Sequence, residues 1–328
     1  MITEFSIDQA FFSSRALNDE SLSAVHDFIT NSWLNFGVMV LPRGSGQCVL
    51  AMIEKLPNKF RQRWVQAFEY GRIFEVDRQW WEFDRYESFE SLCELNELFR
   101  TAFSEDAISY VLCGNDNYKK TCQTTGFEML GAGICSESLH LAKCAELATS
   151  DIIETQTADQ IWNTRFDRLA RHSKNITIMD RYFFENIWRA AQKNLSDEGM
   201  KNFFTFITRY NKKFNIKIIS HGNIKDSDFH TAIYNKFYTS IYKSPIYQKS
   251  LNSLTLISAS DDFFRDQCHD RFIGFDKHIC QIGNGMRILG NSPIPRSTFL
   301  AKFDRDAELA KREASSRSRK YKLWEEQF

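Results

Sequence analysis

RDQCHDRFIGFDKHICQIGNGMRIL, residues 265–289, carries the densest pattern in the chain. Two short apolar runs flank Asp276 and Lys277, which predicts two β-strands joined by a tight turn. Polar residues precede the first run, and a glycine-rich turn follows the second. Residues two apart on a strand point to the same face, so His269 and Arg271 are expected to project together. The stretch therefore predicts a hairpin that presents a histidine beside a guanidinium.

The segments before this hairpin alternate between strand and helix patterns. NITIM, which ends at Asp180, and IKIIS, residues 216–220, are short apolar runs typical of buried strands, and a helical pattern lies between them. Such alternation is typical of an α/β layer. We predict an α/β module over residues 160–300, followed by a charged, helical, surface-lying tail over residues 301–328.

Residues 1–150 form a separate α/β module in the same interpretation, and the polar, Thr-rich residues 148–160 are the candidate boundary. Asp8 follows a strand-like run, where PIN-type nucleases place a metal-binding carboxylate. Two alternatives remain open: a PIN-like site, or an Asp that caps a helix or lies on the surface. The conceivable further ligands, which no spacing supports, are Glu54, Asp116 and Glu128.

Charge is distributed unevenly along the chain. Residues 1–150 hold 13 Lys and Arg against 21 Asp and Glu, and residues 151–328 hold 29 against 21, so the halves carry −8 and +8. The basic half could face a phosphate-rich partner, or the two halves could face each other. No signal-like or membrane-length apolar run is visible, which predicts a cytoplasmic protein without a membrane partner. The 8 cysteines form no C-x-x-C pair, so we expect no metal and no cofactor.

The hairpin resembles the signature of the phospholipase D superfamily. That signature is His-x-Lys-x4-Asp followed six residues later by Gly and a small polar residue, and here Arg replaces the Lys. The resemblance covers about residues 170–295 and implies a mixed sheet flanked by helices. It also implies roles for individual residues: His269 as a nucleophile that forms a phosphohistidine, Arg271 as the phosphate clamp, Asp276 as the group that orients a histidine, and Gly283, Asn284, Gly285 and Asp180 as the lining of the substrate pocket.

The chain carries one such motif, whereas the superfamily builds its active site from two histidines. Catalysis would therefore require a homodimer that brings two His269 side chains together. The form HDRFI…D…IGNG is similar to a divergent branch that includes the C-terminal domain of MIT-domain proteins, which binds phosphoinositides without evident catalysis, and bacterial relatives linked to anti-phage systems.

The function that this resemblance implies is a metal-independent phosphodiesterase or nuclease that acts on DNA or RNA, in bacterial defence and alongside partner proteins of a defence complex. The alternatives are a catalytically inactive phosphate-binding or scaffold subunit, a structural ion pair between Asp270 and Arg271, and binding of a lipid headgroup.

Overall fold

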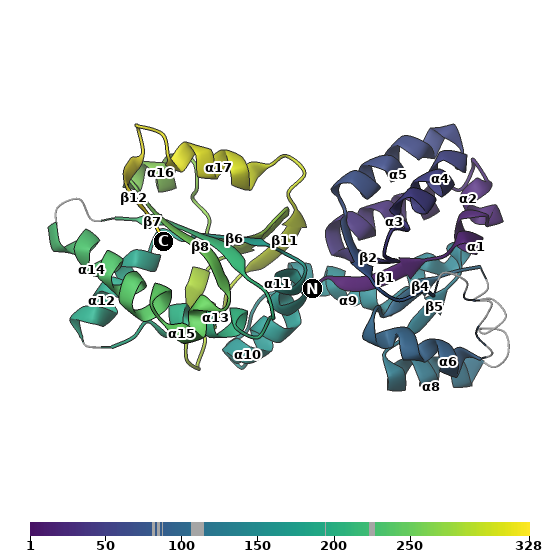
Figure 1. Ribbon diagram of the computed structural model, residues 1–328, viewed down its shortest axis with the longest axis horizontal. Helices are drawn as coiled ribbons and strands as arrows, with labels where there is room; N and C mark the ends of the chain where they lie inside the picture. The colour runs from purple at the N-terminus through teal and green to yellow at the C-terminus, as the bar shows by residue number, and fades with distance from the viewer. Residues whose placement is uncertain (81–82, 84–85, 87, 106–114, 194, 223–226) are drawn as a thin grey trace. The chain divides into compact units, whose positions relative to one another are not determined.

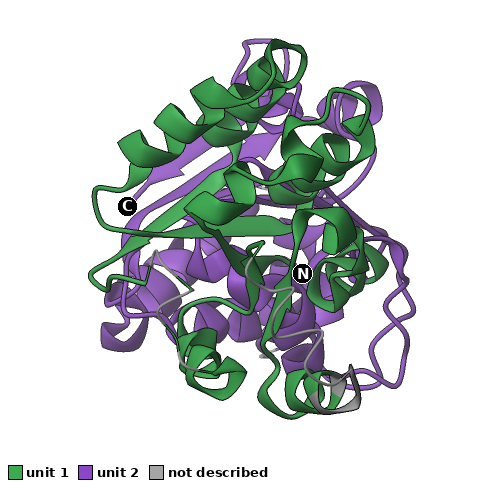
Figure 2. Ribbon diagram, turned by 90° about the vertical axis from the view of Figure 1, so that its right-hand side faces the viewer, with its two compact units in different colours: residues 1–146 green, residues 147–328 purple. Residues whose placement is uncertain are grey.

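The computed structural model describes residues 1–328 except 81–82, 84–85, 87, 106–114, 194 and 223–226. The chain divides into two compact units, Met1–Glu146 (unit 1) and Leu147–Phe328 (unit 2) (Figure 2). This division lies just before the polar segment proposed as the boundary. Each unit has its own sheet flanked by helices, which confirms the predicted α/β class.

Unit 1 is built on a parallel sheet with β1 at its centre. In Figure 1, α3, α4 and α5 lie over one face of the sheet and α6 and α8 over the other. Burial on both faces accounts for the apolar sequence of the central strands. In spatial order the strands are β3 (Arg72–Val76), β2 (Gly37–Pro42), β1 (Thr3–Ile7), β4 (Thr101–Phe103) and β5 (Glu128–Leu130).

The longer helices of unit 1 are amphipathic and turn their apolar side chains toward this sheet. Pro57 separates two of them, as a proline within a helical pattern predicts. The sequence AISYVLCG, residues 107–114, is an apolar run that predicts a further strand, and it lies outside the described residues. The helices are α1 (Gln9–Phe12), α2 (Arg15–Asn18), α3 (Ser23–Phe36), α4 (Gly46–Lys55), α5 (Asn58–Tyr70), α6 (Phe89–Leu92), α8 (Asn115–Thr125) and α9 (Leu139–Thr149).

Unit 2 is built on a mixed sheet of seven strands, in agreement with the expected mixed sheet. Its central strands β6, β7 and β8 are parallel to one another, and the other strands run antiparallel to their neighbours. In spatial order the strands are β11 (Phe299–Phe303), β10 (His278–Ile282), β9 (Phe272–Phe275), β6 (Asn175–Met179), β7 (Phe214–His221), β8 (Leu251–Ala259) and β12 (Lys322–Gln327).

Helices cover both faces of this sheet. Figure 1 shows α16 and α17 on one face and α12 to α15 on the other. Among the described residues, no helix is both long and apolar enough to cross a membrane. The helices are α10 (Ala158–Ile161), α11 (Asp167–Arg171), α12 (Phe183–Gln192), α13 (Glu198–Ile207), α14 (Ser227–Phe237), α15 (Pro245–Gln248), α16 (Asp261–Asp266) and α17 (Glu308–Ser316).

The predicted helical tail over residues 301–328 is wrong at both ends, because residues 301–303 belong to β11. Only α17 is helical, and the last residues form β12, which pairs antiparallel with β8. The ring of Trp324 on β12 stacks on Phe184, with 5.3 Å between centroids. Without β12, the backbone groups along the outer side of β8 would form an open sheet edge, so the pairing gives the tail a structural role.

Candidate functional site

The strand directions of unit 2 bring several polar residues to one edge of the sheet. The parallel strands β6, β7 and β8 all end there, β9 begins there because it runs antiparallel to β6, and β10 returns there. In open α/β sheets the carboxyl ends of the strands are where ligands bind. The residues at this edge are Asp180, His221, Asp261, Arg271, Gly283, Asn284 and Gly285.

Asp180 and Arg271 form the centre of this edge. The carboxylate of Asp180 is buried, with 4% of its side chain exposed, and its Oδ1 lies 3.6 Å from the Nε of Arg271. The backbone N–H groups of Tyr182 and Met286 donate to Oδ1 and Oδ2, both at 3.0 Å. Burial raises the pKa of Asp180, while these amides and the guanidiniums of Arg271 and Arg287 act in the opposite direction. Asp180 therefore holds Arg271 and the turn after β10 in one arrangement.

Gly285 makes this arrangement possible. Its φ of 54° lies in the left-handed region, and a Cβ at this position would lie 2.0 Å from Oδ2 of Asp180 and 2.7 Å from Cδ of Arg271. Only glycine combines that backbone conformation with such close approach of a carboxylate. Gly285 thus leaves the space in which Asp180 and Arg271 contact each other.

A cavity of about 310 Å³ opens beside this pair. Arg271 reaches it with 27% of its side chain exposed, and its Nη1 donates to the carbonyl of Gly283. Asn284 lines the cavity too, and its Nδ2 donates to the carbonyl of Arg296 at 2.6 Å. The lining contains three arginines and two carboxylates: Arg189, Arg271, Arg287, Asp180 and Glu185.

His269 lies apart from this cavity. Strand β9 begins at Phe272, so His269 and Arg271 both precede it, and the same-face argument for a strand does not apply to them. His269 is exposed and is absent from the cavity lining. Among the described residues the ion pair of Arg271 is with Asp180 and not with Asp270, the partner that the alternative named.

Asp276 lies at the opposite edge of the sheet. It forms the turn between β9 and β10 with a φ of 50°, five residues beyond Arg271, or about 17 Å along a strand. Its Oδ2 accepts from the N–H of Lys174 at 3.0 Å, and its Oδ1 accepts from the N–H and side-chain amide of Asn175 at 3.0 and 2.8 Å. The predicted orientation of a histidine by Asp276 does not fit this placement, and the side chain instead fastens the hairpin to the start of β6.

We expect Asp276→Ala to destabilise unit 2 by about 1–2 kcal/mol, because three hydrogen bonds are lost and alanine disfavours a positive φ. Urea unfolding measures this effect. Ligand binding at the Arg271 edge should be unchanged. Asp270→Ala, which removes an exposed carboxylate nearby in the sequence, is the control and should leave the stability unchanged. If folded Asp276→Ala lost ligand binding, Asp276 would be part of the functional site, as the sequence analysis predicted.

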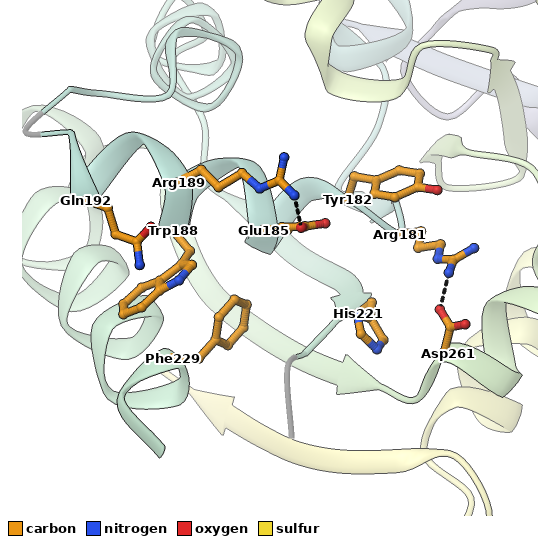
Figure 3. A pocket seen from close by; sticks show the side chains of 9 residues that line it. All are labelled: Arg181, Tyr182, Glu185, Trp188, Arg189, Gln192, His221, Phe229 and Asp261. Carbon is orange, nitrogen blue, oxygen red and sulfur yellow. Dashed lines mark hydrogen bonds and ion pairs between the residues drawn. The ribbon is translucent and has the colours of Figure 1, made fainter. Parts of the chain in front are cut away.

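The sequence alone assigned no role to three further residues at this edge, His221, Arg181 and Asp261. His221 ends β7 and lines a second cavity of about 320 Å³ (Figure 3). Burial lowers the pKa of His221 below its ordinary value, while the neighbouring carboxylate of Asp261 acts in the opposite direction and Arg181 in the same direction as burial. Arg181 itself pairs with Asp261. The sequence offered one signal for these residues, which is that each ends or follows one of the parallel strands β6, β7 and β8.

In unit 1, Asp8 has a structural role. It is the N-cap of α1, its Oδ1 accepts from the N–H of Phe11 at 2.8 Å, and Ser104 donates to its Oδ2. Glu128 is likewise occupied, accepting from Thr101 Oγ1 and from backbone N–H groups at the start of α9. These contacts support the capping interpretation of Asp8.

The other conceivable ligands add no metal site within the described residues. Glu54 is exposed on α4, and the side chain of Asp116 lies outside the described part of the structure. No group of three or more His, Cys, Asp or Glu side chains among the described residues is arranged to hold a metal ion.

The chain has no significant match among the protein families and the curated proteins with which it was compared. The resemblance of the hairpin to the phospholipase D signature therefore stays a prediction from the motif.

Proposed function

We propose that unit 2 binds phosphodiester groups of nucleic acid at the carboxyl edge of its sheet. The observation that carries this proposal is the cavity in which Arg271, oriented by the buried Asp180, lies with Arg189 and Arg287. A guanidinium offers paired donors that match two oxygens of a phosphate, and it stays charged at every physiological pH.

The charges of the cavity leave donors for a ligand. Arg189 pairs with Glu185 at 2.5 Å and Arg271 with Asp180, whereas the exposed Arg287 forms no hydrogen bond or ion pair through its side chain with another described residue. A phosphate bound between Arg271 and Arg287 would balance the excess of one positive charge in the lining. The surplus of basic residues in the second half of the chain favours the same class of ligand.

In binding assays with a labelled oligonucleotide at a stated salt concentration, Arg287→Ala should weaken binding about tenfold. It should also reduce the slope of log K against log salt by about 1, because one phosphate contact is removed. The matched control is Arg171→Ala, which removes the same charge at the opposite edge of the sheet, from an exposed pair with Asp167. Equal losses in both variants, or no binding by the wild type, would contradict the proposal.

Cleavage through His269 is the second candidate function, favoured by the exposure of that side chain to a ligand or a second copy of the chain. In this function an imidazole nitrogen forms a bond to phosphorus while the bond from phosphorus to one sugar oxygen breaks, and that oxygen leaves as an alcohol after taking up a proton from water. A second water then hydrolyses the phosphohistidine, which frees the phosphate end of the strand and restores the imidazole. Cleavage of DNA or RNA that survives EDTA and disappears in His269→Ala would support it. Binding without cleavage would leave the binding role alone. Action in anti-phage defence, with partner proteins, rests on the sequence resemblance.

A further inference from the structure

The second cavity adjoins the phosphate cavity. Both contain Tyr182, Glu185 and Arg189 in their linings, so the cavities adjoin at these three side chains, and we refer to the two together as the depression. Each has a volume near 300 Å³, at the lower end of the range for small-molecule sites. A ligand larger than a phosphate group would therefore extend from one into the other.

The chemistry of the second cavity differs from that of the first. Figure 3 shows Trp188 and Phe229 at one end, with ring centroids 5.7 Å apart, and the Arg181–Asp261 pair at the other. His221 lies between these ends. Aromatic faces with hydrogen-bonding groups at their edges are the usual surroundings of an unstacked nucleobase.

Tyr182 lies where the two cavities meet. The residue is 39% exposed, and its hydroxyl forms no hydrogen bond with another described residue. The guanidiniums of Arg181 and Arg271 lie over its ring, 5.3 and 5.0 Å from its centre, in cation–π contacts that a stacking base would share. An exposed ring beside cations is the arrangement with which proteins bind single strands, stacking a base while the arginines contact the backbone.

We propose that this depression binds an unpaired nucleotide of a single strand, with its phosphate against Arg271 and Arg287 and its base against Tyr182, in the second cavity. The inference rests on the proposed function and specifies its ligand. A base within a duplex is paired and stacked on both sides, so it cannot enter the cavity or stack on Tyr182.

The test compares two labelled ligands, a short thymidine strand and a backbone of equal length in which every unit is abasic. Wild type should bind the thymidine strand about tenfold more tightly, since stacking on an aromatic side chain contributes about 1–3 kcal/mol per base. Tyr182→Leu should bind both ligands with the same, weaker affinity and an unchanged salt slope. Tyr182→Phe should restore the preference, and Tyr70→Leu, which replaces a tyrosine that is 46% exposed in unit 1, should retain it.

The outcomes separate this inference from the proposed function. Arg287→Ala should weaken binding of both ligands alike. If wild type bound both ligands in a salt-dependent way without preferring the strand that carries bases, that result would overturn the base site and leave the phosphate site standing. Tighter binding of duplex than of single strand would have the same meaning. Absence of binding to both ligands would overturn the two proposals together. If thymidine monophosphate displaced the labelled strand as effectively as an unlabelled strand does, the ligand of the site would be a free nucleotide, and the proposal of a single strand would be overturned.

Discussion

Gly285→Ala should destabilise unit 2 by about 3 kcal/mol. About 1 kcal/mol comes from placing a side chain in the left-handed region, and about 2 kcal/mol from forcing a methyl group into an occupied space. The new methyl carbon would lie 2.0 Å from the buried Oδ2 of Asp180, so the carboxylate must move. Its hydrogen bond from the N–H of Met286 and its contact with Arg271 would be lost with that movement.

Urea unfolding of the full chain measures the effect, and Gly44→Ala is the matched control. Gly44 also has a positive φ, of 80°, but a Cβ there meets nothing within 4 Å, so its substitution should cost only the backbone term, about 1 kcal/mol. If the units unfold in separate transitions, each substitution should shift its own. Equal effects of the two substitutions would mean that the Asp180 carboxylate does not occupy the space beside Gly285.

The same substitution connects stability with the site. Displacement of Asp180 removes the group that orients Arg271, so folded Gly285→Ala should also bind oligonucleotides more weakly than wild type. Glycine is therefore required in this turn for two reasons, its positive φ and the space that the Asp180 carboxylate needs. The sequence pattern alone does not separate them.

The hairpin was predictable from the sequence, but the grouping of its polar residues was not. Apolar runs on both sides of Asp276 predicted β9 and β10 correctly, because a strand needs only local alternation and a turn. The role assigned to Asp276 ignored the length of β9, which carries the turn to the edge opposite Arg271. The spacing of a motif gives the distance between residues along the chain. It does not reveal that Asp276 and Arg271 lie at opposite ends of a strand.

Long-range pairing explains the other differences. His221 gains its importance from the neighbouring ends of β6 and β8, and nothing near it in the sequence reveals them. The last residues look like a charged tail until β8 is seen to pair with them. Residues 90–103 have a helical pattern, but the helix ends early for a similar reason, since Thr101–Phe103 joins the parallel sheet as β4 beside β1. Pairing with a neighbouring strand can override the secondary structure that the local sequence favours.

Acid should destabilise unit 1 through one buried histidine. His26 is fully buried, its ring stacks on Phe60 with 3.8 Å between centroids, and its Nδ1 accepts from Nε1 of Trp64 at 2.9 Å. Burial lowers the pKa of His26 to about 4, and Arg63 acts in the same direction. The imidazole is therefore neutral in the folded chain, whereas it has a pKa near 6.5 when unfolded.

The free energy of unfolding of unit 1 should thus fall between pH 6.5 and pH 4, where the unfolded chain binds a proton that the folded chain excludes. A difference of about 2.5 pKa units corresponds to about 3 kcal/mol. Because carboxylates also titrate in this range, the measurement is the stability difference between wild type and His26→Gln, which keeps an acceptor for Trp64 but does not titrate. Wild type should lose about 3 kcal/mol relative to the variant between pH 7 and pH 4. A difference that does not change with pH would show that His26 takes up its proton at the same pH in the folded and the unfolded chain.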